Sequence, residues 1–385
     1  MKISIPKEIQ ENESRVALVP QSVKKITQKG FEVLIESGAG EAALFQDKEY
    51  EEAGGKIVKD LEVLYSNADL IIKVRKPALN KKTGRHELDL MKEEVCLVSL
   101  LEPSTSIDTV QKLLTKKISA FSLESIPRIT RAQSMDVLSS MSTISGYKSV
   151  IIAASHLPKF FPMLMTAAGT IAPAKVFIIG AGVAGLQAIA TAKRLGAVVE
   201  AFDTRKAVKE QTESLGARFI ELDVGSEETE GEGGYAKQIS KDLHQKELEL
   251  IGKQAKKADV VITTAQVPGK KAPILITEQI VKEMQAGSVI VDLAADQGGN
   301  CELTELGNKT TVHGITICGF LNLPSSMPTH ASQMFSKNME SVISHLIKNN
   351  QLNLDLNDEI TKGALITHKG TIVQESIKGL LAGVH

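Results

Sequence analysis

The chain has 385 residues, of which 42% are hydrophobic and 24% charged, and its formal net charge is −1. This length can bury the cores of two α/β domains, and the composition is typical of a folded globular protein. The balanced charge gives no excess positive field, so we expect no binding to nucleic acid. The N-terminal MKISIPKEIQ lacks an apolar signal segment, and no uncharged stretch is long enough to predict direct membrane insertion.

The first half of the chain alternates short apolar runs with helical patterns. We predict helices such as 22–29 and 105–115 between strands at 2–5, 31–36, 69–74, 95–100 and 118–123. Strands that alternate with helices at this spacing indicate a parallel, doubly wound sheet.

The second half repeats this rhythm more clearly. Its predicted strands are 175–179, 198–202, 218–221, 260–264, 288–293 and 315–319, and its predicted helices are 185–195, 206–215, 277–283 and 332–347. Six strands in this alternation predict the Rossmann plan. The predicted fold class is therefore α/β, with two Rossmann-like doubly wound parallel-sheet domains joined by long helices.

Two long helices are expected to connect the halves. One covers 145–157 and ends before Pro158; the other, 332–349, returns the chain so that the tail at 368–373 completes the first sheet. The first domain then comprises 1–144 plus 345–385, and the second comprises 145–344. The acidic, glycine-rich stretch 223–236 predicts a mobile surface loop.

Cysteine and histidine spacings predict no metal site. Cys96, Cys301 and Cys318 are few, widely separated and odd in number, which is typical of buried reduced thiols. The eight histidines form no ligand spacing with them or with acidic residues.

A glycine-rich turn carries the first functional signal. The apolar run KVFII leads into Gly180-Ala181-Gly182-Val183-Ala184-Gly185, which is followed by the helical pattern LQAIATAKRLG. This is G-x-G-x-x-G in the strand–turn–helix context that binds a dinucleotide pyrophosphate, although a purely structural turn is the alternative. Gly180 permits the tight turn, Gly182 the approach of the pyrophosphate, and Gly185 close helix–strand packing. The helix N-terminus would present N–H groups to the phosphates.

Further candidate nucleotide-binding residues follow later strands. Asp203 ends the strand after the turn, where a carboxylate binds the ribose hydroxyls of NAD and repels the 2′-phosphate of NADP. Thr204 and Arg205 come next; Arg205 could instead neutralise a phosphate, but we interpret it as stacking near the adenine. Other candidates at strand ends, for which a simple strand-to-loop transition is the alternative, are Thr264, Ala265, Gln266 and, more weakly, Asn322.

Motifs spread over the whole chain resemble one known family. They are Ile5-Pro6-Lys7-Glu8, Glu13-Ser14-Arg15-Val16-Ala17 followed by Pro20, Gly38-Ala39-Gly40, Lys73-Val74, Val267-Pro268-Gly269 and Val291-Asp292-Leu293-Ala294. Alanine dehydrogenases and the NAD(H)-binding component of proton-translocating transhydrogenase share these motifs. The resemblance implies a common two-domain fold.

Two stretches resemble the transhydrogenase branch. The first, residues 127–140, is similar to a loop that contacts the nicotinamide end of NAD(H). The resemblance implies that Gln133 lies toward the incoming NADP(H), while Arg128, Asp136 and Ser139 bind nicotinamide, ribose or phosphate; the neighbouring candidates are Ile129, Thr130, Arg131, Ser134 and Met135. A polar linker with Ser or Asp as a helix cap is the alternative. The second stretch, with Gly234 and Tyr235, resembles a mobile loop that closes over bound nucleotide, against the alternative of an exposed loop tyrosine.

The alanine dehydrogenase branch matches less well at its catalytic positions. Its catalytic histidine lies in a run like F-L-H-L, where this chain has Ser99-Leu100-Leu101-Glu102. Its substrate-binding lysine is replaced by Arg75. Without that histidine, oxidation of an amino acid loses its acid/base group. Asp296 fits both branches.

The resemblance therefore implies hydride transfer between NAD(H) on this chain and NADP(H) on a partner component. It also implies a homodimer, a membrane-spanning partner that moves protons, and a cytoplasmic location attached to the inner membrane through partner subunits. The start at Met1 favours a separate subunit over an excised domain. Two rivals stay open: an alanine-type dehydrogenase, and a non-catalytic NAD(H)-sensing module.

Overall fold

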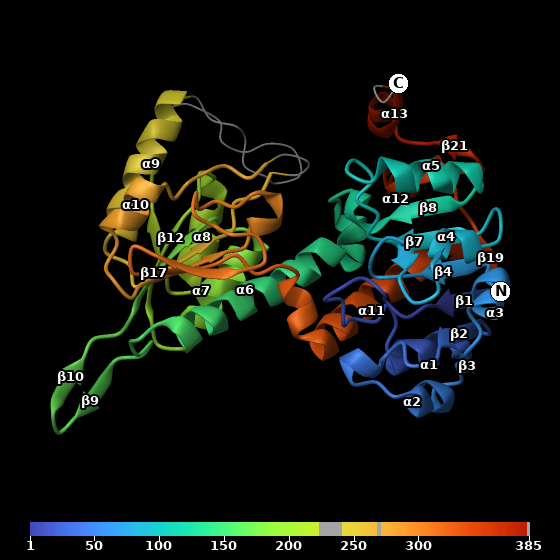
Figure 1. The fold of residues 1–385 in the computed structure, drawn as a ribbon, viewed down its shortest axis with the longest axis horizontal. Helices are drawn as coiled ribbons and strands as arrows, with labels where there is room; N and C mark the ends of the chain where they lie inside the picture. The colour runs from blue at the N-terminus through green and yellow to red at the C-terminus, as the bar shows by residue number, and fades with distance from the viewer. Residues whose placement is uncertain (223–240, 268–270, 383–385) are drawn as a thin grey trace. The chain divides into compact units, whose positions relative to one another are not determined.

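The computed structural model describes residues 1–222, 241–267 and 271–382 (Figure 1). The chain forms two compact units, one made of Met1–Met141 with Ser325–His385 and the other of Ser142–Pro324. Within the described ranges, none of the helices has the length and apolarity needed to cross a membrane.

The chain re-enters the first unit at Ser325, earlier than the predicted residue 345. Helix α11 (Pro328–Leu346) belongs to the first unit, whereas the sequence analysis assigned most of its residues to the second domain. The physical reason is its apolar face: Phe335, Met339 and Val342 are buried, and the helix packs against α1 (Pro20–Gln28) and the 3₁₀ segment η3 (Thr130–Met135).

The sheet of the first unit has the strand order β21-β20-β8-β7-β4-β1-β2-β3. Its first six strands in sequence are parallel. The tail joins this sheet, as the sequence predicts, but through β20 and β21, the first of which begins before residue 368, and β20 pairs antiparallel with β8, which was not predicted. The strands are β1 (Lys2–Ile5), β2 (Glu32–Glu36), β3 (Lys56–Val58), β4 (Leu70–Ile72), β7 (Cys96–Ser99), β8 (Ser119–Ser122), β20 (Leu365–His368) and β21 (Thr371–Ile372).

Helices supply the apolar side chains that cover this sheet. Leu64, Leu113 and Ile377 share one core cluster with Ile71 and Leu97 of the sheet, so α3, α5 and α13 cover the same face. The helices are α2 (Asp47–Glu52), α3 (Leu61–Ser66), α4 (Glu87–Leu90), α5 (Ile107–Thr115), α12 (Glu359–Ala364) and α13 (Glu375–Ala382), besides α1 and α11.

The second unit contains the predicted six-strand Rossmann sheet. Its strand order is β13-β12-β11-β14-β15-β17-β16, in which the six predicted strands are parallel in the doubly wound order and β16 adds an antiparallel edge. The strands are β11 (Lys175–Ile179), β12 (Val198–Phe202), β13 (Arg218–Ile220), β14 (Val260–Thr263), β15 (Val289–Asp292), β16 (Lys309–Val312) and β17 (Ile315–Cys318).

Helices lie on both faces of this second sheet, as the alternation of β11 requires. Val176 and Ile178 belong to a core cluster that includes side chains of α6 (Val137–His156) and α7 (Val183–Arg194). Phe177 and Ile179 point to the opposite cluster, with side chains of α9 (Lys241–Ala255) and α10 (Glu278–Glu283). A strand with both faces buried is apolar throughout, which explains the run KVFII.

A hairpin formed by β9 (Leu164–Thr166) and β10 (Gly169–Ile171) extends away from the second sheet (Figure 1). Its apolar side chains are exposed: Met163 is 56% and Met165 is 78% accessible. Phe160 and Ile171 are also exposed on this segment. The second unit thus leaves an apolar arm uncovered, and this arm was not predicted from the sequence.

Candidate functional site

The glycine turn after β11 requires its glycines for different reasons. Gly180 has a φ of +94°, and an ideal Cβ there would lie 2.4 Å from Thr264 Oγ1. An ideal Cβ on Gly185 would lie 1.9 Å from the Gly180 carbonyl oxygen, so this glycine allows α7 to pack against the turn. At Gly182 the nearest atom to such a Cβ is Arg205 Nη2, at 3.8 Å. Packing alone therefore requires glycine at Gly180 and Gly185 but not at Gly182, which is the pattern expected if the space beside Gly182 serves a ligand.

Helix α7 starts directly at this turn. Gly182 is its N-cap, and Val183 and Ala184 begin its first turn, whose N–H groups have no partner inside the helix. The glycine at Gly146 allows α6 to pack closely against the first turn of α7, because an ideal Cβ on Gly146 would lie 2.1 Å from the Ala184 carbonyl oxygen. The fold thus provides a helix N-terminus of the kind that can bind an anion, next to Gly182, whose Cβ position is open.

Candidate residues from three strands meet at the carboxyl edge of this sheet. Strand β11 pairs with β12 on one side and β14 on the other, so the strand order reverses here and opens the crevice in which doubly wound sheets bind ligands. Thr264, after β14, donates its backbone N–H to the Ile179 carbonyl at 2.8 Å and its hydroxyl to the Gly180 carbonyl at 3.1 Å. Asp203, after β12, accepts the Ala181 N–H at 2.7 Å and is buried.

Arg205 lies at the same edge, paired with Asp203. Its Nη2 is 2.7 Å from Asp203 Oδ2, and Thr204 between them is half-buried. Gln266 is exposed and donates its side-chain amide to the Leu293 carbonyl at 2.8 Å, while Asn322 follows β17 with a φ of +48°. All the candidates of the second unit that the structure describes therefore follow strands of one sheet at its carboxyl end.

Two residues that the sequence analysis did not assign to the site hold the loop after β14. The buried Asp292 carboxylate accepts the Thr263 hydroxyl at 2.9 Å and the Asn300 N–H at 2.8 Å. Asn300 in turn bonds both backbone groups of Ala265, at 3.0 and 2.9 Å. Asp292 lies in a motif quoted above, but its partners are distant in sequence, so its role required the folded structure.

The segment with Arg128 and Gln133 lies in the first unit, and both side chains are exposed. It consists mainly of η3, which is anchored by buried Ala132 and Met135 and by a 2.9 Å hydrogen bond from Asn338 to the Ser134 carbonyl. The other candidates, Ile129 and Thr130, are half-buried and exposed respectively. The exposed Arg131 pairs with Asp358, which is not a candidate, at 2.7 Å.

Asp136 and Ser139 also have a local structural role. Asp136 accepts the Ser139 N–H at 2.8 Å and the Ser139 hydroxyl at 2.6 Å immediately before and within the first turn of α6. This is the helix-capping alternative considered for the segment. It accounts for these two side chains in part, but it does not account for the exposed Arg128 and Gln133.

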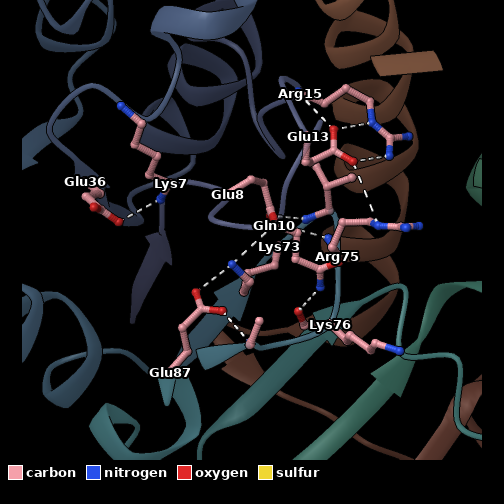
Figure 2. Close-up of polar contacts among 12 residues, drawn as sticks. Lys7, Glu8, Gln10, Glu13, Arg15, Glu36, Lys73, Arg75, Lys76 and Glu87 are labelled. Carbon is pink, nitrogen blue, oxygen red and sulfur yellow. Dashed lines mark hydrogen bonds and ion pairs between the residues drawn. The ribbon is translucent and has the colours of Figure 1, made fainter. Parts of the chain in front are cut away.

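The first unit holds a buried ion network at the ends of β1 and β4 (Figure 2). Lys73 is fully buried; its Nζ lies 2.7 Å from Glu87 Oε1 and 3.5 Å from Glu8 Oε2. Glu8 accepts the Val74 N–H at 2.6 Å. Glu87 also accepts the Tyr65 hydroxyl at 2.7 Å. The family motifs Ile5-Pro6-Lys7-Glu8 and Lys73-Val74 thus meet in one network, which orders the loops at this sheet edge.

Burial controls the protonation of this network. Desolvation raises the pKa of the Glu8 carboxyl from 4.5 to about 7, although Lys73 acts in the opposite direction. Burial also raises the pKa of the nearby Glu36 carboxyl. The Glu8 carboxyl is therefore partly protonated near neutral pH, beside the buried Lys73.

Leu101 is the residue that, by the resemblance to alanine dehydrogenases given above, corresponds to their catalytic histidine. This side chain is 1% exposed and follows β7. Nearby, Arg75 forms ion pairs with Glu102 at 3.4 Å and with Glu13 at 3.9 Å, and Glu13 is itself held by Arg15 at 2.5 Å. Leu101 offers no group that could exchange a proton with an amino-acid substrate.

Two candidates, Gly234 and Tyr235, lie outside the described residues, as does the predicted loop 223–236. Among the residues that the structure does describe, no three His, Cys, Asp or Glu side chains are grouped to hold a metal ion.

Comparisons with known proteins cover both units. Residues 4–145 match the family model "Alanine dehydrogenase/PNT, N-terminal domain", and residues 149–375 match "Alanine dehydrogenase/PNT, C-terminal domain". Among solved structures, a transhydrogenase from Sinorhizobium meliloti superposes with a TM-score of 0.84 and 38% identity, covering 98% of this chain and 100% of that one. An L-alanine dehydrogenase gives 0.83 and 27%, with full coverage of both chains.

Sequence relatives separate the two branches. The chain is 46% identical over 382 residues to an NAD(P) transhydrogenase subunit alpha protein of Rhodospirillum rubrum, covering 98% of this chain and 99% of the relative. It is 44% identical to the "NAD(P) transhydrogenase subunit alpha" of Haemophilus influenzae, covering 96% and 71%. An "Alanine dehydrogenase" of Staphylococcus epidermidis is 34% identical, covering 85% and 82%. The chain belongs to the alanine dehydrogenase/PNT family, and these identities place it with the transhydrogenase alpha subunits.

Proposed function

We propose that the chain binds NAD(H) at the carboxyl edge of its second sheet and exchanges hydride with NADP(H) held on a partner component. The glycine turn and the N-terminus of α7 bind the diphosphate, and Asp203 binds the adenosine ribose. The assignment of the diphosphate to this turn rests on the open space beside Gly182, where an added Cβ would meet nothing closer than 3.8 Å. The bound nicotinamide supplies the hydride chemistry.

The observation that carries the choice of reaction is Leu101. Hydride exchange between two nicotinamides needs no proton transfer to or from the protein, whereas oxidation of alanine needs a group on the protein that accepts a proton. By the resemblance, Leu101 corresponds to the dehydrogenase histidine, and a buried leucine there suits the first reaction and not the second.

The protein's task in this reaction is to orient the rings and keep water away. We assign this to the 128–139 segment, where the exposed Arg128 and Gln133 offer donors, while Asp136 and Ser139 offer further polar groups at the start of α6. Following the family resemblance, Gln133 faces the incoming NADP(H). In the same proposal the chain works as a homodimer, and a membrane-spanning partner couples the exchange to proton movement.

The exposed arm around β9 and β10 supports the homodimer. Phe160, Met163, Met165 and Ile171 gather on one short segment without cover from their own unit. Exposed apolar surface of this kind marks an interface. An arm that extends from its unit can pack against a second copy of the chain, with each copy contributing its arm to the other.

The experiment mixes the purified chain with an NADP(H)-binding transhydrogenase component and follows reduction of a spectrally distinct NADP⁺ analogue by NADH. We expect exchange only when both components are present, and a Gln133→Asn variant should slow exchange by at least about 10-fold while changing the Kd for NADH by less than about 3-fold. Tight NADH binding without exchange would instead support the NAD(H)-sensing module. NADH formation from alanine and NAD⁺ by the chain alone would show that the protein is a dehydrogenase.

A further inference from the structure

The Asp203 carboxylate already has a full set of hydrogen-bond donors. Its Oδ1 accepts the Arg205 backbone N–H and the Arg205 Nε–H, each at 2.9 Å. Its Oδ2 accepts the Ala181 N–H and the Arg205 Nη2–H, each at 2.7 Å. A carboxylate offers about four lone-pair sites, so these four donors fill it. Two ribose hydroxyls can bind Asp203 only if two of the present donors leave.

Only the guanidinium can leave without unfolding the site. The N–H groups of Ala181 and Arg205 belong to the backbone of the phosphate turn and of the loop after β12. The Arg205 guanidinium, by contrast, ends a flexible side chain that is 14% exposed, beside an Asp203 side chain that is 5% exposed. Its Nη2 also lies 3.8 Å from the position of a Cβ on Gly182. The guanidinium therefore lies beside both the Asp203 carboxylate and the phosphate turn.

The surrounding charges make this pairing favourable in the absence of nucleotide. Glu247 of α9 adds a second carboxyl to the same region. Its pKa is raised, mainly by burial and in smaller part by the charge of Asp203, while its 2.9 Å hydrogen bond with His244 acts in the opposite direction. Without a cation, Asp203 would be a buried charge close to another acidic group, which is a costly arrangement.

We propose that Arg205 determines the nucleotide specificity of this site by covering Asp203. The guanidinium gives way to the ribose hydroxyls of NAD(H), and it turns toward the 2′-phosphate when NADP(H) enters. This inference rests on the NAD(H) site of the proposed function. While Arg205 covers Asp203 the ribose hydroxyls cannot bind it, so the apparent affinity for NAD(H) is the intrinsic affinity multiplied by the fraction of uncovered sites. The same residue reduces the repulsion of a 2′-phosphate, since it brings a cation to the place where Asp203 brings an anion.

The test compares Kd values for NADH and NADPH, measured by nucleotide fluorescence, in wild type and in Arg205→Ala. We expect NADH to bind about 5-fold more tightly to the variant and NADPH to bind equally or more weakly. The Kd for NADPH divided by the Kd for NADH should therefore rise at least about 5-fold. Arg205→Lys keeps the cation and should change the ratio by less than about 3-fold. Arg218→Ala is the matched control, because Arg218 pairs with Glu200 on the neighbouring strand and is 75% exposed; it should change neither Kd.

Two results would overturn the proposal: weaker NADH binding by Arg205→Ala, which would make Arg205 a direct ligand of NADH, or two unchanged Kd values. Absence of NADH binding by the wild type would instead refute the proposed function itself. If Arg205→Ala does not fold, crystal structures of the wild type with and without NADH decide the question. The proposal requires the 2.7 Å contact between Arg205 Nη2 and Asp203 Oδ2 to break on binding, and an intact contact would contradict it.

Discussion

Alanine substitutions at Gly185 and Gly182 should separate packing from ligand binding within one turn. At Gly185 a methyl group would lie 1.9 Å from the Gly180 carbonyl oxygen, so α7 must move by roughly 1 Å or more from β11. Overpacking of this kind lowers the free energy of unfolding by about 1–3 kcal/mol. At Gly182 the added methyl group meets nothing closer than 3.8 Å, and the extended backbone there suits alanine. Loss of glycine at this N-cap should cost only about 0.5 kcal/mol.

The two variants should differ just as clearly in NADH binding. A methyl group on Gly182 occupies the space that the pyrophosphate needs, so we expect the Kd for NADH to rise at least about 10-fold, or about 1.4 kcal/mol, in a protein of nearly normal stability. Gly185→Ala should lose both stability and binding, since it displaces the whole turn. Urea unfolding and NADH titration of both variants measure these quantities. Normal NADH affinity in Gly182→Ala, or normal stability in Gly185→Ala, would refute the reasoning.

Two further predictions concern the buried network and the exposed arm. Because burial raises the pKa of Glu8 to about 7, the stability from its protonated form is present below pH 4.5 and is lost as the pH rises through about 7. Glu8→Gln should therefore reduce the fall in unfolding free energy between about pH 5 and about pH 8 by up to about 3 kcal/mol, and an unchanged slope in denaturant titrations would contradict the raised pKa. If the chain forms the proposed homodimer through this arm, Met165→Asp should sediment as a monomer in sedimentation velocity, whereas wild type and Leu306→Asp, a change at another exposed apolar side chain of the same unit, should sediment as dimers. A dimeric Met165→Asp protein would remove the arm from the interface.

The sequence predicted those parts of the fold that local patterns specify. The strands β1, β11 and β12 have the predicted limits, because each is a short apolar run bounded by turn residues or glycine. Short edge strands such as β3 and β16 were missed, since edge strands carry fewer buried side chains and a weaker pattern. Helix α6 begins at Val137 instead of residue 145, and Asp136 caps it; the sequence offered a Ser or Asp cap here only as an alternative, and the hydrogen bonds of Asp136 decide for it.

In the candidate site too, features set by local sequence were predicted, and features that depend on contacts in the folded structure were not. The conformations of Gly180 and Gly185 follow from motif spacing, since the turn is local. The pairing of Arg205 with Asp203 was not predicted from the sequence, because it depends on the hydrogen-bond geometry at a buried carboxylate; the stacking of Arg205 near the adenine stays a prediction. Lys73 and Glu87 come together only through the order of the strands and helices in the first unit.

The central claim is that hydride passes directly between two nicotinamides with no proton from the protein. Mass spectrometry of the NADPH formed from 4-deuterated NADH and NADP⁺, with both components present, tests it most directly. We expect the NADPH to carry the deuterium of the transferable position and to gain none from D₂O when the donor is unlabelled. NADPH that takes its new hydrogen from solvent, or a donor that loses its label without forming labelled NADPH, would contradict the account.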